Sequence, residues 1–266
     1  MSRDISGFSN PLVKRVKSLR DKKYRRAEGL FLAEGLRILT EALDAGIVPE
    51  MLWFSPESAT HVLVQRLASA TKAMGGEVLL TNNDILAKLS GKDNPGAVLG
   101  VYPERFTPLV MVDRSKADIW IVAERLRDPG NLGTILRTGD AVGAGGLILI
   151  DDCTDPFSVE AVRASMGAVF TQTITIAKWD EFIRWLRGGP GQLVGTSLNT
   201  ETDYQTPRYS APTFLLVGNE SQGLPVAYEA QCDLLVKMPM RGKADSLNAA
   251  MACAVMAYEV LNQRRG

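Results

Sequence analysis

The chain has 266 residues, of which 45% are hydrophobic and 23% charged, a balance typical of globular rather than disordered proteins. Its 30 Lys and Arg residues equal its 30 Asp and Glu residues, so the total charge indicates no particular partner. Three cysteines without a CxxC pair and a single histidine argue against a metal site of the zinc type and favour a reducing compartment.

The chain ends contain no membrane signal. The first residues include no apolar stretch suited to a signal peptide, and the apolar run over residues 249–258 is too short to span a bilayer. We therefore expect a soluble cytoplasmic protein without a membrane partner.

The first 26 residues are strongly basic. They hold nine basic residues against two acidic ones, a local net charge of +7. Asn10 and Pro11 open a stretch with helical periodicity, which predicts a basic helix. Such a segment is typical of phosphate binding, although a solvated helix face has the same composition. The residues predicted to contact the phosphate groups of a partner are Lys14, Arg15, Lys17, Lys22, Lys23, Arg25 and Arg26.

Alternating helices and strands follow up to residue 103. The patterns predict helices over 31–45, 59–73 and 83–91, and strands over 50–55, 77–80 and 97–102. Residues 1–103 are therefore expected to form a small α/β domain, and the non-periodic residues 104–117 a linker.

A second alternating series fills residues 118–266. Its predicted strands are 118–124, 146–151, 173–177, 192–197, 213–218 and 233–238, and its predicted helices are about 130–142, 158–167, 179–187 and 245–263. Short Val, Ile and Leu-rich strands between helices indicate a mostly parallel sheet covered on both faces. The fold class is therefore α/β.

The first loop with chemical potential follows the strand at 118–124. Pro129 and Gly130 turn the chain, Asn131 suits a helix N-cap, and Arg137 lies about two turns into the helix. A capped helix with a surface arginine explains these residues equally well. A dinucleotide site is disfavoured because no GxGxxG follows the strand.

Two further loops follow strand ends, where parallel sheets bind ligands. In the first, Gly218 and Gly223 permit close approach of a ligand, and Glu220 can accept a hydrogen bond or act as an acid or base. In the second, Asp245 or Ser246 is the predicted cap of the last helix. That helix is apolar on all sides, which predicts burial, including burial against a second subunit.

Together the three loops resemble the SpoU family of RNA ribose 2′-O-methyltransferases. The matching residues are Asn131, Gly133 and Arg137, then Gly218, Asn219, Glu220 and Gly223, then Pro239, Ser246, Leu247 and Asn248. Ser221 and Ala249 depart from the family pattern. The first domain is similar to the family's ribosomal-protein-like substrate-binding domain, through Lys17, Lys23, Gly29, Phe31, Glu34 and Gly35.

The resemblance implies a C-terminal methyltransferase domain with a deep trefoil knot, a homodimer, and S-adenosylmethionine (AdoMet) as cofactor. The cofactor-binding residues that it implies are Thr196, Ser197, Gly218, Asn219, Met238, Ser246 and Leu247. The implied reaction transfers a methyl group to a ribose 2′-hydroxyl of structured RNA, with ribosomal RNA as first choice and transfer RNA as second.

The resemblance assigns activation of the hydroxyl to Arg137. Arginine scarcely deprotonates in proteins, so Arg137 can instead hold a phosphate and stabilise the developing alkoxide. Asn131, Glu220 and Asn248 are the candidates for orienting the reactants, and Glu220 is the alternative base.

Two other functions fit parts of the sequence. One is an RNA-binding pseudo-enzyme of the same fold, against which the intact motif residues argue. The other is a nucleotide-dependent enzyme for small metabolites, against which the missing fingerprint and the basic first domain argue.

Overall fold

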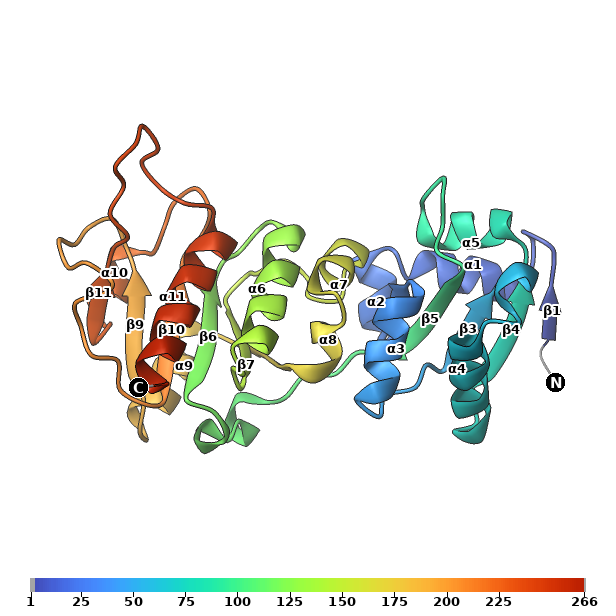
Figure 1. Ribbon diagram of the computed structural model, residues 1–266, viewed down its shortest axis with the longest axis horizontal. Helices are drawn as coiled ribbons and strands as arrows, with labels where there is room; N and C mark the ends of the chain where they lie inside the picture. Colours follow the sequence, from blue (N-terminus) through green and yellow to red (C-terminus); the bar gives the residue numbers. More distant parts are fainter. Residues whose placement is uncertain (1–2, 266) are drawn as a thin grey trace. The chain divides into compact units, whose positions relative to one another are not determined.

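The computed structural model describes residues 3–265, which form two compact units (Figure 1). The first unit contains the chain up to Glu104 together with Asp155–Thr171. The second contains Arg105–Thr154 and the chain from Gln172 onward. The sequence-based division into 1–103, 104–117 and 118–266 does not separate the 155–171 segment, which packs with the first unit.

The first unit is built on a five-stranded sheet in the order β1-β4-β3-β5-β2. Strands β1, β4 and β3 are parallel, and β5 is antiparallel to β3 and β2. The strands are β1 (Arg3–Ile5), β2 (Leu30–Glu34), β3 (Met51–Phe54), β4 (Glu77–Thr81) and β5 (Val98–Pro103). The helices are α1 (Pro11–Ser18), α2 (Lys22–Glu28), α3 (Leu36–Asp44), α4 (Val62–Ala73), α5 (Asn83–Ser90), α7 (Val159–Ser165) and α8 (Ala168–Thr171).

The basic N-terminal stretch forms two helices rather than one. Asn10 caps α1 by accepting a hydrogen bond from the Leu12 amide, as the sequence predicts. Asp21 then caps α2 by accepting one from the Lys23 amide. The helix breaks there because an aspartate side chain competes for backbone donors and favours a new N-terminus.

The predicted helix over residues 31–45 is wrong in its first part. Leu30–Glu34 is strand β2, and the helix begins only after Gly35. The apolar side chains of β2 are buried on both faces of the sheet, so they give a continuous apolar run that periodicity alone does not distinguish from a helix.

An aromatic cluster holds the 155–171 segment against the first unit. The ring centroid of Phe31 on β2 lies 4.7 Å from that of Phe157 and 5.7 Å from that of Phe170. Tyr102 of β5 lies 4.7 Å from Phe170. Aromatic pairs at these distances stabilise a core beyond the area that they bury.

The second unit contains a six-stranded, wholly parallel sheet in the order β11-β9-β10-β6-β7-β8. The strands are β6 (Ile119–Glu124), β7 (Gly146–Ile150), β8 (Thr173–Ala177), β9 (Gln192–Thr196), β10 (Thr213–Val217) and β11 (Leu234–Val236). The helices are α6 (Pro129–Ala141), α9 (Trp179–Arg187), α10 (Val226–Glu229) and α11 (Ala249–Arg264). The linker contributes two 3₁₀ turns, η2 (Leu109–Met111) and η3 (Arg114–Lys116).

The predicted parallel α/β sheet is therefore confirmed. Strand β10 lies between β6 and β9, so the loops after β6 and β10 leave the sheet side by side. A loop crevice between neighbouring strands of this kind is where open parallel sheets bind ligands.

The caps of α6 and α11 differ from the predicted ones. Asp128 rather than Asn131 caps α6, and its carboxylate accepts from the Asn131 amide at 2.6 Å. Asn248 rather than Asp245 or Ser246 caps α11, and it accepts from the amides of Ala250 and Met251. Both asparagine side chains therefore lie at the helix N-termini.

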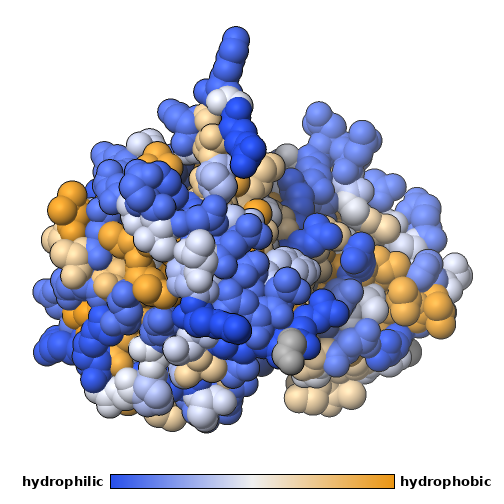
Figure 2. All heavy atoms as spheres, turned by 60° about the vertical axis from the view of Figure 1, so that its left-hand side comes forward, coloured by the Kyte–Doolittle hydropathy of each residue, from blue (hydrophilic) through white to orange (hydrophobic). Residues whose placement is uncertain are grey.

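Helix α11 packs against α6 and β10 but is not buried on all sides. Met251, Val255 and Tyr258 are 63%, 37% and 51% exposed and follow one another at helical spacing. Most of the face in Figure 2 is hydrophilic, with apolar side chains in separate patches. None of the helices between residues 3 and 265 combines the length and apolar character that crossing a bilayer requires.

Candidate active site

A cavity of about 360 Å³ lies at the carboxyl edge of the parallel sheet, between the loops after β9, β10 and β11. Its volume is within the range of about 300–1,000 Å³ that small-molecule sites span. Every residue that the sequence assigned to cofactor binding lines this cavity, namely Thr196, Ser197, Gly218, Asn219, Met238, Ser246 and Leu247.

The loop after β10 leaves room for a ligand only because of its glycines. A Cβ atom at Gly218 would lie 2.5 Å from the carbonyl carbon of Gly223, which no side chain tolerates. Gly223 itself has a φ of 66°, in the left-handed region that favours glycine. The side chain of Asn219 fixes the turn between them by accepting from the amides of Ser221 and Gln222. Ser221 fits the turn, since its hydroxyl donates to Asn219 as well.

Glu220 joins this loop to the N-terminus of α6. Its carboxylate accepts from the backbone amides of Arg127 at 3.0 Å and Asp128 at 2.9 Å, and from the side-chain amide of Asn131 at 3.2 Å. The Oδ1 atom of Asn131 in turn accepts from Nδ2 of Asn248 at 2.9 Å. The three motifs therefore meet in one chain of hydrogen bonds.

This chain of hydrogen bonds forms one wall of an open cleft of about 660 Å³ that adjoins the cavity. The cavity and the cleft share several residues: Asn219, Glu220, Ser221, Ser246, Leu247 and Ala249. A ligand in the cavity and a larger substrate in the cleft can therefore contact each other at Glu220 and Ser246.

The hydrogen bonds also determine the acidity of Glu220. Its partial burial alone would raise the pKa of the carboxyl group. The donors at Asp128, Arg127 and Asn131 outweigh burial and bring the pKa of Glu220 below its ordinary value. A carboxylate of lowered pKa stays ionised and is a poor base.

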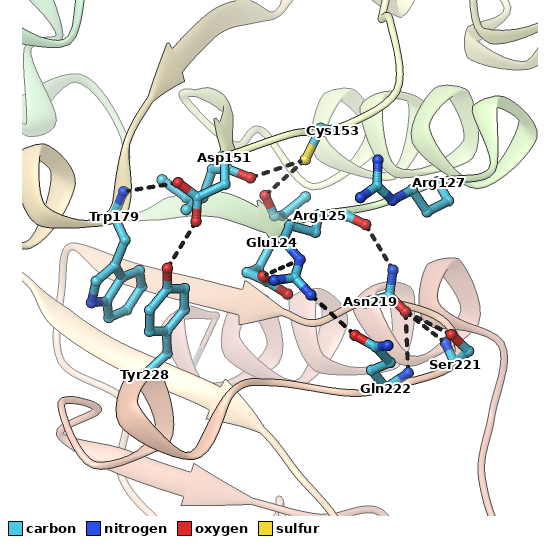
Figure 3. Close-up of polar contacts among 12 residues, drawn as sticks. Glu124, Arg125, Arg127, Asp151, Cys153, Trp179, Asn219, Ser221, Gln222 and Tyr228 are labelled. Atoms are coloured by element: carbon cyan, nitrogen blue, oxygen red, sulfur yellow. Dashed lines mark hydrogen bonds and ion pairs between the residues drawn. The ribbon is translucent and has the colours of Figure 1, made fainter.

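Beneath this loop lies a buried acid that the sequence reasoning missed (Figure 3). Glu124, the last residue of β6, is 1% exposed and pairs with Nε of Arg125 at 3.3 Å. Burial raises the pKa of Glu124. Arg125 has a φ of 44°, a strained value for a residue other than glycine, and its Nη2 atom donates to Gln222. An acidic residue at the end of an otherwise apolar strand was the signal available for it.

Arg125 also ties the two loops together through its backbone. Nδ2 of Asn219 donates to the Arg125 carbonyl oxygen at 2.8 Å, as Figure 3 shows. The loop after β6 and the loop that carries Glu220 are therefore connected by both side-chain and backbone hydrogen bonds.

The structure does not bring Arg137 to this site. Its side chain is exposed on α6, and it lines neither the cavity nor the cleft of the described chain. Asn131, Glu220 and Asn248 are the residues of the predicted catalytic set that come together.

One predicted RNA contact is corrected by the structure. Arg25 is 3% exposed, and its guanidinium pairs with Asp155 at 2.6 Å and donates to the carbonyl oxygens of Leu19 and Arg20. Its hydrogen-bonding capacity is used inside the first unit, which excludes it as a phosphate contact. The other predicted RNA-binding residues are exposed on α1 and α2: Lys14, Arg15, Lys17, Lys22, Lys23 and Arg26.

Several residues of the cavity wall were also missed, among them Asn199, Glu229 and Met240. They belong to loops and to the short helix α10, which no periodic pattern marks. Within residues 3–265, no three His, Cys, Asp or Glu side chains are grouped closely enough to hold a metal ion.

A parallel sheet with a ligand cavity at its carboxyl edge, joined to an open cleft, defines an α/β protein that binds a small molecule beside a larger substrate. Comparison with known proteins identifies the family within this class. Residues 118–258 match the SpoU rRNA Methylase family, and residues 10–100 match the MRM3-like substrate binding domain. The chain belongs to the SpoU rRNA Methylase family, which confirms the resemblance of its motifs.

Relatives of known structure and activity cover nearly the whole chain. The AdoMet-bound rRNA methyltransferase from Sinorhizobium meliloti is 40% identical, with a TM-score of 0.90 over 99% of this chain and 98% of that one. The 23S rRNA (uridine(2479)-2′-O)-methyltransferase of Streptomyces viridochromogenes is 30% identical over 92% of this chain and 87% of the relative. The 23S rRNA (guanosine(2553)-2′-O)-methyltransferase RlmP of Bacillus subtilis is 28% identical over 97% of this chain and 99% of the relative.

Proposed function

We propose that this chain is a methyltransferase that moves the methyl group of AdoMet to a ribose 2′-hydroxyl of ribosomal RNA, with transfer RNA as second choice. The observation that carries the proposal is the chain of hydrogen bonds from Glu220 through Asn131 to Asn248, at the junction of the cavity and the cleft. The relatives act on 23S rRNA by their names, which favours ribosomal RNA.

The residues of the cavity fit AdoMet. Its walls combine apolar side chains, such as Val217, Leu224 and Val236, with backbone that glycines keep open. Apolar walls suit an adenine ring, and exposed amides suit its polar edge. When bound, AdoMet supplies an electrophilic methyl group, so the protein mainly has to align the reacting atoms.

Glu220, Asn131 and Asn248 act together as a positioning unit for the ribose. The lowered pKa of Glu220 makes its carboxylate a weak base, and its acceptor sites are shared among three donors. It therefore orients Asn131 and the helix N-terminus rather than removing the proton. The pseudo-enzyme alternative is not favoured, since this network is intact.

Arg137 requires a second copy of the chain for the role that we predict. It lies outside the cleft of its own chain, and the family resemblance implies a homodimer. The exposed side chains of Met251, Val255 and Tyr258 support association through α11. We propose that the dimer brings Arg137 of one copy to the cleft of the other, where it holds a phosphate and stabilises the developing alkoxide.

Two further features stay predictions. The insertion of β10 between β6 and β9 supports a trefoil knot in the second unit. A cytoplasmic location is expected because ribosomal RNA, the proposed substrate, is found there.

The basic residues of α1 and α2 other than Arg25 supply phosphate contacts of little sequence specificity.

The proposal is tested with labelled AdoMet and RNA that lacks the modification. Incubation with ribosomal and transfer RNA in separate reactions should label ribosomal RNA. Labelling of transfer RNA alone would move the substrate to the second choice. Absence of label from both, with AdoMet bound, would favour the pseudo-enzyme.

A further inference from the structure

A second polar cluster lies in the cavity wall, apart from Glu220. Glu229, the last residue of α10, is 7% exposed and lines the cavity with Ser197 and Asn199 of the loop after β9. None of the three lines the open cleft. The cluster therefore faces a ligand in the cavity and not the substrate in the cleft.

The hydrogen bonds of this cluster leave acceptor capacity on Glu229, which lines the cavity. The Ser197 hydroxyl donates to Oε1 of Glu229, and Nδ2 of Asn199 lies 3.3 Å from Oε1 and 3.2 Å from Oε2. The backbone amide of Asn199 donates to Oγ of Ser197 at 2.9 Å, which fixes the direction of the hydroxyl. A carboxylate has about four lone-pair positions, so acceptor capacity remains on Glu229.

Glu229 has no cationic partner within residues 3–265. The lysine of the same wall, Lys237, pairs instead with the exposed Glu201 at 2.7 Å. Buried carboxylates are normally compensated by charges or by several hydrogen bonds. The remaining acceptor capacity of Glu229 is therefore suited to donors that a ligand brings.

We infer that Glu229, oriented by Ser197 and Asn199, accepts hydrogen bonds from the vicinal ribose hydroxyls of the cofactor. The inference rests on the proposed function, because it takes AdoMet as the ligand. Two carboxylate oxygens can accept from two neighbouring hydroxyls, as an acidic residue does for the ribose in dinucleotide-binding folds. Leu224 and Val236 line the same cavity and offer apolar surface to the adenine.

This role has a consequence for kinetics. Glu229 does not line the cleft, so we expect it to make no contact with the reacting atoms. Its loss should therefore raise the KM for AdoMet while kcat at saturating AdoMet stays near that of the unmodified protein.

The test is calorimetric binding of AdoMet and of 5′-methylthioadenosine, which has the ribose but no amino-acid chain. We expect Glu229→Gln to weaken both ligands by about tenfold or more, as loss of a charged hydrogen bond does. Glu201→Gln is the matched control, since it removes the same charge from the loop that carries Ser197 and Asn199, at a position outside the cavity lining. It should leave both affinities unchanged.

A second comparison begins with the unmodified protein, where it is independent of the folding of any variant, and is then repeated with Glu229→Gln. Adenosine should bind more tightly than 2′,3′-dideoxyadenosine, and Glu229→Gln should remove most of that difference. Equal binding of the two nucleosides would overturn the inference. Loss of affinity for AdoMet alone, with 5′-methylthioadenosine unaffected, would also overturn it, because the carboxylate would then serve the amino-acid end. An unmodified protein that binds no AdoMet would contradict the proposed function itself.

Discussion

Asn248 donates from Nδ2 to Oδ1 of Asn131 at 2.9 Å, while its own Oδ1 caps α11. One side chain therefore both begins the last helix and connects it to the hydrogen-bond chain that ends at Glu220. The start of α11 and the geometry of the site depend on the same residue.

Substitution of Asn248 should separate these two roles. Asn248→Ala removes both, so we expect a loss of about 1 kcal/mol in the free energy of unfolding and a fall in kcat/KM of at least about tenfold. Asn248→Ser retains a capping oxygen but does not reach Asn131. It should be close to the unmodified protein in urea denaturation and as impaired as Asn248→Ala in methyl transfer. Full activity of the serine variant would show that the link to Asn131 is dispensable.

Mixing two inactive variants tests whether Arg137 acts across a dimer. Arg137→Ala and Asn248→Ala should each be impaired alone. If Arg137 serves the partner's cleft, a mixed dimer has one site with both residues intact, and activity returns in proportion to the mixed species. Retention of the untagged Asn248→Ala variant on an affinity resin by an affinity-tagged Arg137→Ala variant confirms that mixed dimers form. If the mixed dimers transfer methyl groups no faster than the two variants do separately, Arg137 acts within its own chain or not at all.

Among the basic residues of α2, Arg25 should stabilise the fold, whereas the others should contact RNA. Lys23→Ala should weaken RNA binding and reduce the slope of log affinity against log salt by about 0.7–0.9, with no loss of stability. Arg25→Ala should instead destabilise the fold by about 3–5 kcal/mol, because it leaves Asp155 buried without its partner. Filter binding at several salt concentrations and urea denaturation measure the two effects. A stable Arg25 variant with weakened RNA binding would reverse this assignment.

Glu104 should make stability depend on pH. Burial, followed by the nearby charge of Asp155, raises the pKa of Glu104 from 4.5 to about 6. A carboxyl group whose pKa is raised by folding contributes stability that is present below pH about 4.5 and lost as the pH rises through about 6. The free energy of unfolding should therefore fall relative to that of Glu104→Gln across this window, by clearly less than about 2 kcal/mol because solvent screens a half-buried group. Parallel pH curves for the two proteins would refute this.

Much of the fold follows from local patterns. The strands of the second unit are short runs of Val, Ile and Leu between helices, and fully buried parallel strands require such runs. The same property hid β2, since only Glu34 and Gly35 separate its buried apolar residues from the apolar residues of α3. The cap of α6 was misplaced because Asp128 and Asn131 are both good capping residues, and only the observed hydrogen bond distinguishes them.

The site was predictable where it depends on residue types at fixed spacing. Gly218, Glu220 and Asn248 stand at loop positions that a ligand site needs, and the structure gathers them. The supporting residues were not predictable. Arg125 meets Gln222 only because β10 lies beside β6, and Glu229 reaches the cavity from a short helix without a periodic pattern. The burial of Arg25 likewise depends on Asp155, far along the chain.

The most direct test of the account is the chemical position of the transferred methyl group. Ribosomal RNA that has received labelled methyl from AdoMet would be hydrolysed with alkali, which spares the bond next to a 2′-O-methylated ribose. We predict that the label appears in alkali-resistant dinucleotides and that Asn248→Ala reduces its amount. Label released with the bases would contradict the proposed reaction.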